Sequence, residues 1–169
     1  LRQERDQGRV GAIGISALCP EDAMEALNDP DVTVIQVASS LLDRRLQTAR
    51  FFEKASERGV AVHVRSVFLQ GAAFLDPTSL PRHLEPLAPS IGILDDLANE
   101  LHVPRPVLFM AWAQRLGASR LLVGCERIDQ LQEQIQWFQD ADAIRGEVEL
   151  AASKLPSLGP DLLAPSRWS

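Results

Sequence analysis

The sequence has 169 residues, 46% of them hydrophobic, and a net charge of −6, which suits one domain with its own hydrophobic core. Its basic residues are interleaved with acidic ones, which excludes a general nucleic-acid binder because such proteins cluster Lys and Arg. The apolar runs are too short to cross a bilayer, so we expect no membrane association and a cytoplasmic protein. Cys19 and Cys125 fit neither a disulfide framework nor a zinc site, and we expect no metal.

The first elements predicted along the chain are the end of a helix, a strand and a second helix. Residues 1–7 are typical of the last turns of a helix, which Gly8 ends, and the chain therefore has the pattern of a fragment. The small, apolar run 10–16 predicts a strand. Pro20 and the acidic residues after it begin a helix that stops at residues 28–30.

The middle of the chain repeats this alternation. Residues 32–37 are β-branched at most positions, which predicts a strand buried on both faces. An amphipathic helix over 42–58 ends at Gly59, and the next strand follows at 60–64. The Pro- and Ser-rich segment 76–89 predicts a long surface loop.

The last third is mostly helical. Apolar periodicity predicts helices over 90–101, 104–116, 128–138 and 144–154, and a strand over 120–124. In the helix over 128–138, we expect the apolar residues to face inward; they are Ile128, Leu131, Ile135 and Phe138. We expect the tail, 156–169, to lie along the surface, pinned by Trp168.

Strands alternating with helices predict a parallel α/β arrangement, either an open doubly wound sheet or part of a closed barrel. In both arrangements, ligands bind where the carboxyl ends of the strands meet. Polar residues or glycine stand at that end of all four predicted strands: Ser16, Gln36, Arg65 with Ser66, and Gly124 followed by Cys125, Glu126 and Arg127. Together they predict one binding site.

Four runs carry a family resemblance: GAIGIS at 11–16, IQ at 35–36 with LLDRR at 41–45, RSVFLQG at 65–71, and LVG at 122–124. In their order and spacing they resemble the C-terminal half of an aldo-keto reductase. The resemblance implies the C-terminal half of a (β/α)8 TIM barrel: four parallel strands alternating with helices, barrel strands five to eight, plus extra C-terminal helices. We therefore expect one domain over 1–169, with 156–169 as its tail.

The resemblance also implies cofactor contacts for named positions. Ser16 and Gln36 correspond to residues that bond the nicotinamide carboxamide. Arg65 stands where the family often has an aromatic ring stacked on the nicotinamide. Ser66, Val67, Phe68 and Gly71 correspond to the pyrophosphate side of the loop. Near the adenosine, the resemblance implies contacts from Gly124, Cys125, Arg127, Gln130 and Gln134, with the helix N-terminus offering amides to an anion.

The implied activity is NAD(P)H-dependent interconversion of a small-molecule carbonyl and alcohol. NADP is the first choice of cofactor, with NAD open, because Arg127 is the only nearby cation and Glu126 opposes it. The family's catalytic Asp, Tyr, Lys and His come from the first half of the barrel. Since this sequence has no tyrosine, we expect no catalytic residue in it and no activity alone. His63 is expected to be a buried interior residue.

Two other readings stay open: a non-catalytic α/β binding or assembly module that keeps the half-barrel scaffold, and a free-standing doubly wound domain. Four strands cut from a barrel have two unpaired edges. We therefore expect either a partner that supplies the N-terminal half-barrel or self-association.

Overall fold

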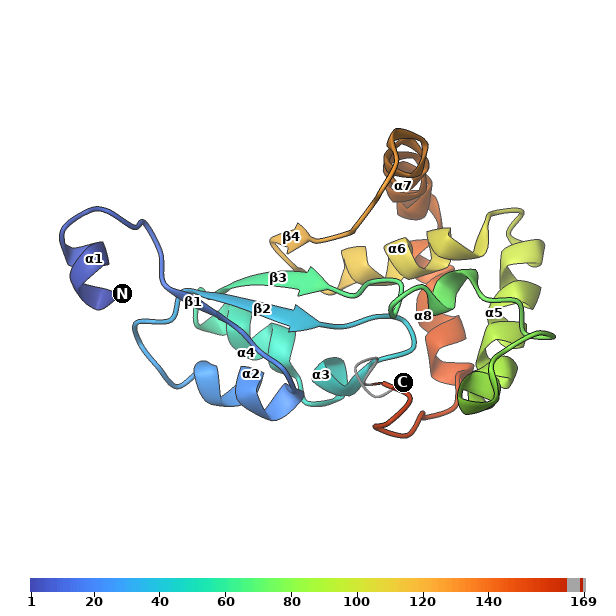
Figure 1. The fold of residues 1–169 in the computed structure, drawn as a ribbon, viewed down its shortest axis with the longest axis horizontal. Coiled ribbons are helices and arrows are strands. Elements are labelled where there is room, and N and C mark those ends of the chain that lie inside the picture. Colours follow the sequence, from blue (N-terminus) through green and yellow to red (C-terminus); the bar gives the residue numbers. More distant parts are fainter. Residues whose placement is uncertain (164–167, 169) are drawn as a thin grey trace.

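The computed structural model describes residues 1–163 and 168, and its centre is one parallel sheet with the strand order β1-β2-β3-β4 (Figure 1). The strands are β1 (Gly14–Ser16), β2 (Val34–Ala38), β3 (Ala61–Arg65) and β4 (Arg120–Leu121). Each crossover returns to the neighbouring strand, as in a barrel, whereas a doubly wound sheet reverses its order. The half-barrel prediction is thus confirmed over the doubly wound alternative.

The α-helices are α1 (Arg2–Asp6), α2 (Pro20–Ala26), α3 (Arg45–Thr48), α4 (Phe51–Glu57), α5 (Ala88–Glu100), α6 (Arg105–Arg115), α7 (Ile128–Asp140) and α8 (Arg145–Lys154). Short 3-10 helices lie at Ala72–Phe74, Arg82–Leu87 and Ala141–Ile144. In Figure 1, α5, α6 and α8 group beyond the arrowheads of β2 and β3, whereas α7 stands apart from the sheet. No helix within residues 1–163 and 168 is long and apolar enough to span a membrane.

The two faces of the sheet differ in their burial. One face lies under α2 and α4, and its buried side chains are Ile35, Val37, Val62 and Val64. The opposite face carries Gln36, His63 and Arg65, which are half-buried. The predictions that 32–37 is buried on both faces and that His63 is a buried residue are therefore wrong. In a half-barrel this second face is the one turned toward the barrel interior.

Several predicted boundaries also differ. The helix expected over 42–58 is two helices, because Arg50 adopts a left-handed φ of 56° between α3 and α4. The loop expected over 76–89 contains the 3-10 helix Arg82–Leu87. Strand β4 stops at Leu121, so residues 122–127 leave the sheet edge and lead to α7. In the tail, Trp168 packs against the core as predicted, and residues 164–167 and 169 lie outside the described residues.

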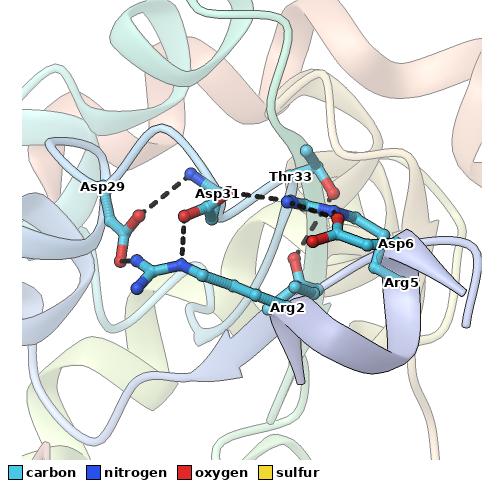
Figure 2. Close-up of polar contacts among 7 residues, drawn as sticks. Arg2, Arg5, Asp6, Asp29, Asp31 and Thr33 are labelled. Atoms are coloured by element: carbon cyan, nitrogen blue, oxygen red, sulfur yellow. Dashed lines mark hydrogen bonds and ion pairs between the residues drawn. The ribbon is translucent and has the colours of Figure 1, made fainter.

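Helix α1 has no buried residue and is held by ion pairs (Figure 2). Arg2 contacts Asp29 at 3.5 Å and also Asp31, and Arg5 Nη1 lies 2.9 Å from the Asp31 carboxylate. Both aspartates belong to the loop before β2. The network therefore lies at the amino ends of the strands, opposite the expected site.

The apolar stripe of α7 is exposed, which contradicts the predicted inward orientation. The exposed fractions are 77% for Ile128, 44% for Leu131, 51% for Ile135 and 49% for Phe138. The residues that α7 turns toward the protein are Gln130, Gln134 and Trp137, and α7 packs against α6.

Candidate functional site

A cleft of about 1040 Å³ opens where β3 and β4 end. One wall comes from the loop after β3 and the other from residues 122–127 and the first turns of α7. Its predicted lining residues are Arg65, Ser66, Val67, Phe68, Gly71, Gly124, Cys125, Arg127, Gln130 and Gln134. The structure thus brings these predicted residues together, while Ser16 and Gln36 lie beside the cleft on β1 and β2.

Ser16, Gln36 and Arg65 form a small polar cluster on the half-buried face of the sheet. The strand register sets Ser16 opposite Gln36, and the Ser16 hydroxyl donates to Gln36 Oε1 at 3.0 Å. Arg65 Nη2 donates to the Ala17 carbonyl at 3.1 Å, and Nη1 donates to Ser66 Oγ at 3.4 Å. Arg65 therefore ties the end of β3 to the end of β1 and links the cleft to the Ser16–Gln36 pair.

The loop after β3 has a strained backbone. Ser66, Leu69 and Gln70 adopt left-handed φ values of 59°, 44° and 54°. A left-handed backbone destabilises the fold by roughly 1–2 kcal/mol for each such residue. Gly71, at φ 90°, has no Cβ and therefore adopts this conformation without the same cost. Burial of Val67, Phe68 and Leu69, each at most 9% exposed, offsets the strain. Strain held in place by packing is typical of functional loops.

Arg105, which the sequence reading missed, fixes the far end of this loop. Its Nε donates to the Ala73 carbonyl at 2.9 Å, and Nη2 donates to the Leu75 carbonyl at 2.5 Å. Its Nη1 pairs with Asp95 Oδ1 at 2.7 Å. Because Arg105 stands in the first turn of α6, 30 residues from the loop, no sequence periodicity could reveal the contact.

On the α7 wall, Gln134 is the most informative side chain. It is 8% exposed, and its Nε2 donates to the Gly124 carbonyl at 2.9 Å. The second polar atom, Oε1, is buried and has no hydrogen-bond partner among the residues that the structure describes. The bond to Gly124 fixes the orientation of the amide, so the atom without a partner is an acceptor. A buried acceptor beside a cleft requires a donor from a ligand or from water.

The N-terminus of α7 is already occupied by groups of this chain. Gln130 Oε1 accepts from the backbone N–H groups of Glu126 at 2.8 Å and Arg127 at 3.2 Å. Arg127 forks onto the Asp129 carboxylate with contacts of 3.0–3.2 Å. The Arg127 guanidinium, followed by the backbone amides of Gln130 and Asp129, holds the pKa of Asp129 below its ordinary value. These contacts reduce what the helix end can offer to an external anion.

Three aromatic rings in the cleft wall form a further group, of which only Phe68 was predicted. The ring centroids of Phe68, Phe74 and Trp137 lie 5.2–6.0 Å apart pairwise. Trp137 stands three residues after Gln134 on the same face of α7. Following the stripe of Gln130 and Gln134 by one more turn would have found it, whereas the apolar stripe pointed to the wrong face. No group of three or more His, Cys, Asp or Glu in the described parts of the chain could hold a metal ion.

Comparison with known proteins adds the family. Residues 1–144 match the model of the aldo/keto reductase family. No curated protein sequence matches. Among solved structures, the aldo-keto reductase AKR11C1 from Bacillus halodurans is similar in its apo form, with a TM-score of 0.72 and 21% identity over 93% of this chain. The thermostable aldo-keto reductase Tm1743 in complex with epalrestat is similar with a TM-score of 0.60 and 19% identity over 90% of this chain.

The chain covers 55% of the Bacillus halodurans protein and 51% of Tm1743, so it spans about half the length of these structures. At these identities the structural likeness carries the fold, and the family assignment comes from the sequence match. That match extends from the first residue through all four strands, the cleft and α7. The chain belongs to the aldo/keto reductase family.

Proposed function

We propose that this chain is the dinucleotide-binding half of an oxidoreductase that interconverts a small-molecule carbonyl and alcohol with a nicotinamide cofactor. The cleft at the ends of β3 and β4 receives the cofactor, whose nicotinamide supplies the hydride. With a volume of about 1040 Å³ it is at the large end of ligand pockets, which run to roughly 1,000 Å³. The family match supports an oxidoreductase, and the cleft supports the choice of ligand.

The observation that carries the proposal is the buried Gln134 Oε1, which has no partner within residues 1–163 and 168. An adenine amino group supplies the N–H donor that this atom lacks, and the rings of Phe74 and Trp137 in the same cleft offer stacking surface. The adenosine end of the cofactor therefore belongs at α7. The nicotinamide end then lies toward Arg65 and the Ser16–Gln36 pair.

The Ser16–Gln36 pair suits a carboxamide. The Ser16 hydroxyl uses its proton on Gln36 Oε1, which keeps a Ser16 oxygen lone pair as acceptor and the Gln36 amide nitrogen as donor. A nicotinamide carboxamide presents N–H donors and a carbonyl acceptor, which complement this pair. Such pairing orients the ring and selects the face that reacts. Arg65 holds the ends of β1 and β3 together at this point.

The other half of the barrel supplies the rest of the site in this proposal. The sequence has no tyrosine, so the family's proton donor comes from outside it. A half-barrel leaves apolar surface for that partner at its β1 and β4 edges and on α7. The residues exposed there include Ile15, Leu122 and Val123, besides the α7 stripe of Ile128, Leu131, Ile135 and Phe138. A second copy of this chain is the competing occupant of the same surface.

The test is a titration with NADH and NADPH followed by tryptophan fluorescence, since Trp137 lines the cleft. Saturable quenching that is lost in Gln134→Leu supports the proposal, because leucine has a similar size and cannot accept a hydrogen bond. Gln136→Leu, on the exposed side of α7, is the matched control. If neither the chain alone nor the chain with an N-terminal half-barrel binds the cofactor saturably, the proposal is wrong.

Turnover separates the enzyme from the alternative, a non-catalytic binding or assembly module. With the N-terminal half supplied, oxidation of NADH or NADPH by a panel of aldehydes and ketones supports the oxidoreductase. Cofactor binding without any turnover in that assembly supports the module.

A further inference from the structure

The charged side chains of the cleft are mainly acidic at its α7 end. Its lining contains Arg65, Glu126, Arg127 and Glu133. Arg65 lies at the strand ends, bonded to the Ala17 carbonyl and Ser66. Near α7, the Arg127 guanidinium is forked onto the Asp129 carboxylate, and Glu126 and Glu133 of the lining add two further carboxylates. The net charge of this group is negative.

Helix N-termini often bind phosphate through their unpaired amides. In α7, however, Gln130 Oε1 takes the N–H groups of Glu126 and Arg127. The Asp129 carboxylate in the first turn is already an anion at this end of the helix. The N–H groups of Glu126 and Arg127 and the Arg127 guanidinium are therefore not available to a ligand phosphate without displacing a group of the chain.

We propose that the cleft takes NADH in preference to NADPH, because Asp129 pairs with the arginine at the α7 end of the cleft, and Glu126 and Glu133 of the lining repel a ribose 2′-phosphate. This inference rests on the proposed function, which sets the adenosine at α7. The sequence alone favoured NADP as the usual cofactor of the family, and the charges around α7 reverse that choice. A phosphate monoester adds about −1.5 to −2 charge at pH 7, which these carboxylates repel.

The effect is large enough to measure. In water, one carboxylate about 8 Å away weakens the binding of a doubly charged phosphate roughly fivefold. Three carboxylates offset by one arginine therefore weaken the binding of NADPH at least about tenfold relative to NADH. Titration calorimetry on the 169-residue chain is expected to show a dissociation constant for NADPH at least about tenfold above that for NADH. The ratio is expected to shrink in 1 M NaCl, where the screening length is about 3 Å.

Two variants and a control test the residues. Asp129→Asn keeps a capping side chain and frees Arg127, and Glu126→Gln with Glu133→Gln removes the flanking charges. Each is expected to bring the NADPH/NADH ratio of dissociation constants at least about fivefold closer to one. Glu147→Gln, an exposed position on α8 outside the cleft lining, makes the same charge change and leaves the ratio unaltered.

The outcomes separate the two proposals. Equal or tighter binding of NADPH overturns the preference and leaves the cofactor site standing. A preference for NADH that neither salt nor the variants alter also overturns the charge mechanism, because it points to steric exclusion. Binding of neither dinucleotide, with the N-terminal half supplied, removes the proposed function and this inference together.

Discussion

Replacing Arg105 with Met tests whether the strained loop after β3 depends on this clamp. The variant keeps most of the apolar stem and removes the guanidinium. The lost contacts are the hydrogen bonds to the carbonyls of Ala73 and Leu75 and the ion pair with Asp95. The Arg105 side chain is 12% exposed, so water replaces these contacts poorly.

The magnitude follows from these contacts. Hydrogen bonds from charged groups are worth about 1.5–3 kcal/mol each, so two carbonyl bonds give about 3 kcal/mol at the lower end. The pair with Asp95 adds at most about 1 kcal/mol, because the Asp95 side chain is 37% exposed. Left-handed backbone at three non-glycine residues costs roughly 3–6 kcal/mol in total. The clamp is comparable with the strain and adds to the burial of Val67, Phe68 and Leu69, so we expect the loop to open more often when Arg105 is lost.

Hydrogen exchange and urea unfolding measure the two consequences. We expect amides in residues 68–75 to exchange about a hundredfold faster in Arg105→Met, and the free energy of unfolding to fall by about 3 kcal/mol. Arg115→Met, on the same helix and away from the loop, is the control. Unchanged exchange in this segment, with a loss of stability below about 0.5 kcal/mol, would refute the clamp.

Three further predictions concern other parts of the fold. The double variant Leu131→Glu with Ile135→Glu places charge on the exposed stripe of α7. We expect light scattering to show that the chain associates more weakly with a second copy or with the N-terminal half. Gln132→Glu is the control, and an unaltered mass distribution in the double variant argues against this face. Asp31→Asn removes the ion pairs of Asp31 with Arg2 and Arg5, and we expect faster exchange in residues 2–6 with little change in the core. In the native chain, bonding from Arg5 lowers the pKa of Asp31. The attachment of α1 is therefore present above the unfolded pKa of about 4 and is lost as the pH falls through the lower pKa of the folded chain. Attachment of α1 that persists in Asp31→Asn contradicts this prediction. Arg50→Gly relieves a left-handed φ of 56°, and we expect stabilisation of about 0.5–1 kcal/mol by thermal unfolding; a lower melting temperature means the arginine side chain contributes more than the strain.

Local patterns predicted the elements and the location of the site well. The four strands and the polar residues at their ends follow from alternation and from turn residues, which act over a few positions. Parallel winding then brings the strand ends to one mouth, and the cleft is lined by most of the residues predicted for it. Ser16 and Gln36 lie beside it, joined by their own hydrogen bond.

The two errors in burial share one cause, which is that the sequence pattern assumes a complete set of neighbours. The apolar residues of α7 predicted a face packed inward, yet Ile135 is 51% exposed while Gln134 on the opposite side is 8% exposed. The β-branched residues of β2 predicted two covered faces, and one of them is half-buried. Apolar periodicity indicates which side of an element avoids water and leaves open which molecule covers it.

The parallel α/β order, the family resemblance and the residues at the strand ends all follow from local sequence patterns, because each depends on the chain near it. Three features of the packed fold are absent from any local pattern: Arg105 holds the cleft loop, Gln134 has a buried acceptor without a partner among the described residues, and Arg127 pairs with Asp129 beside two further carboxylates. These features depend on which side chains meet across the fold and on how water is excluded between them. Hydrogen-bond partners and local charge balance are therefore properties of the packed chain, and they carry the proposals for the cofactor.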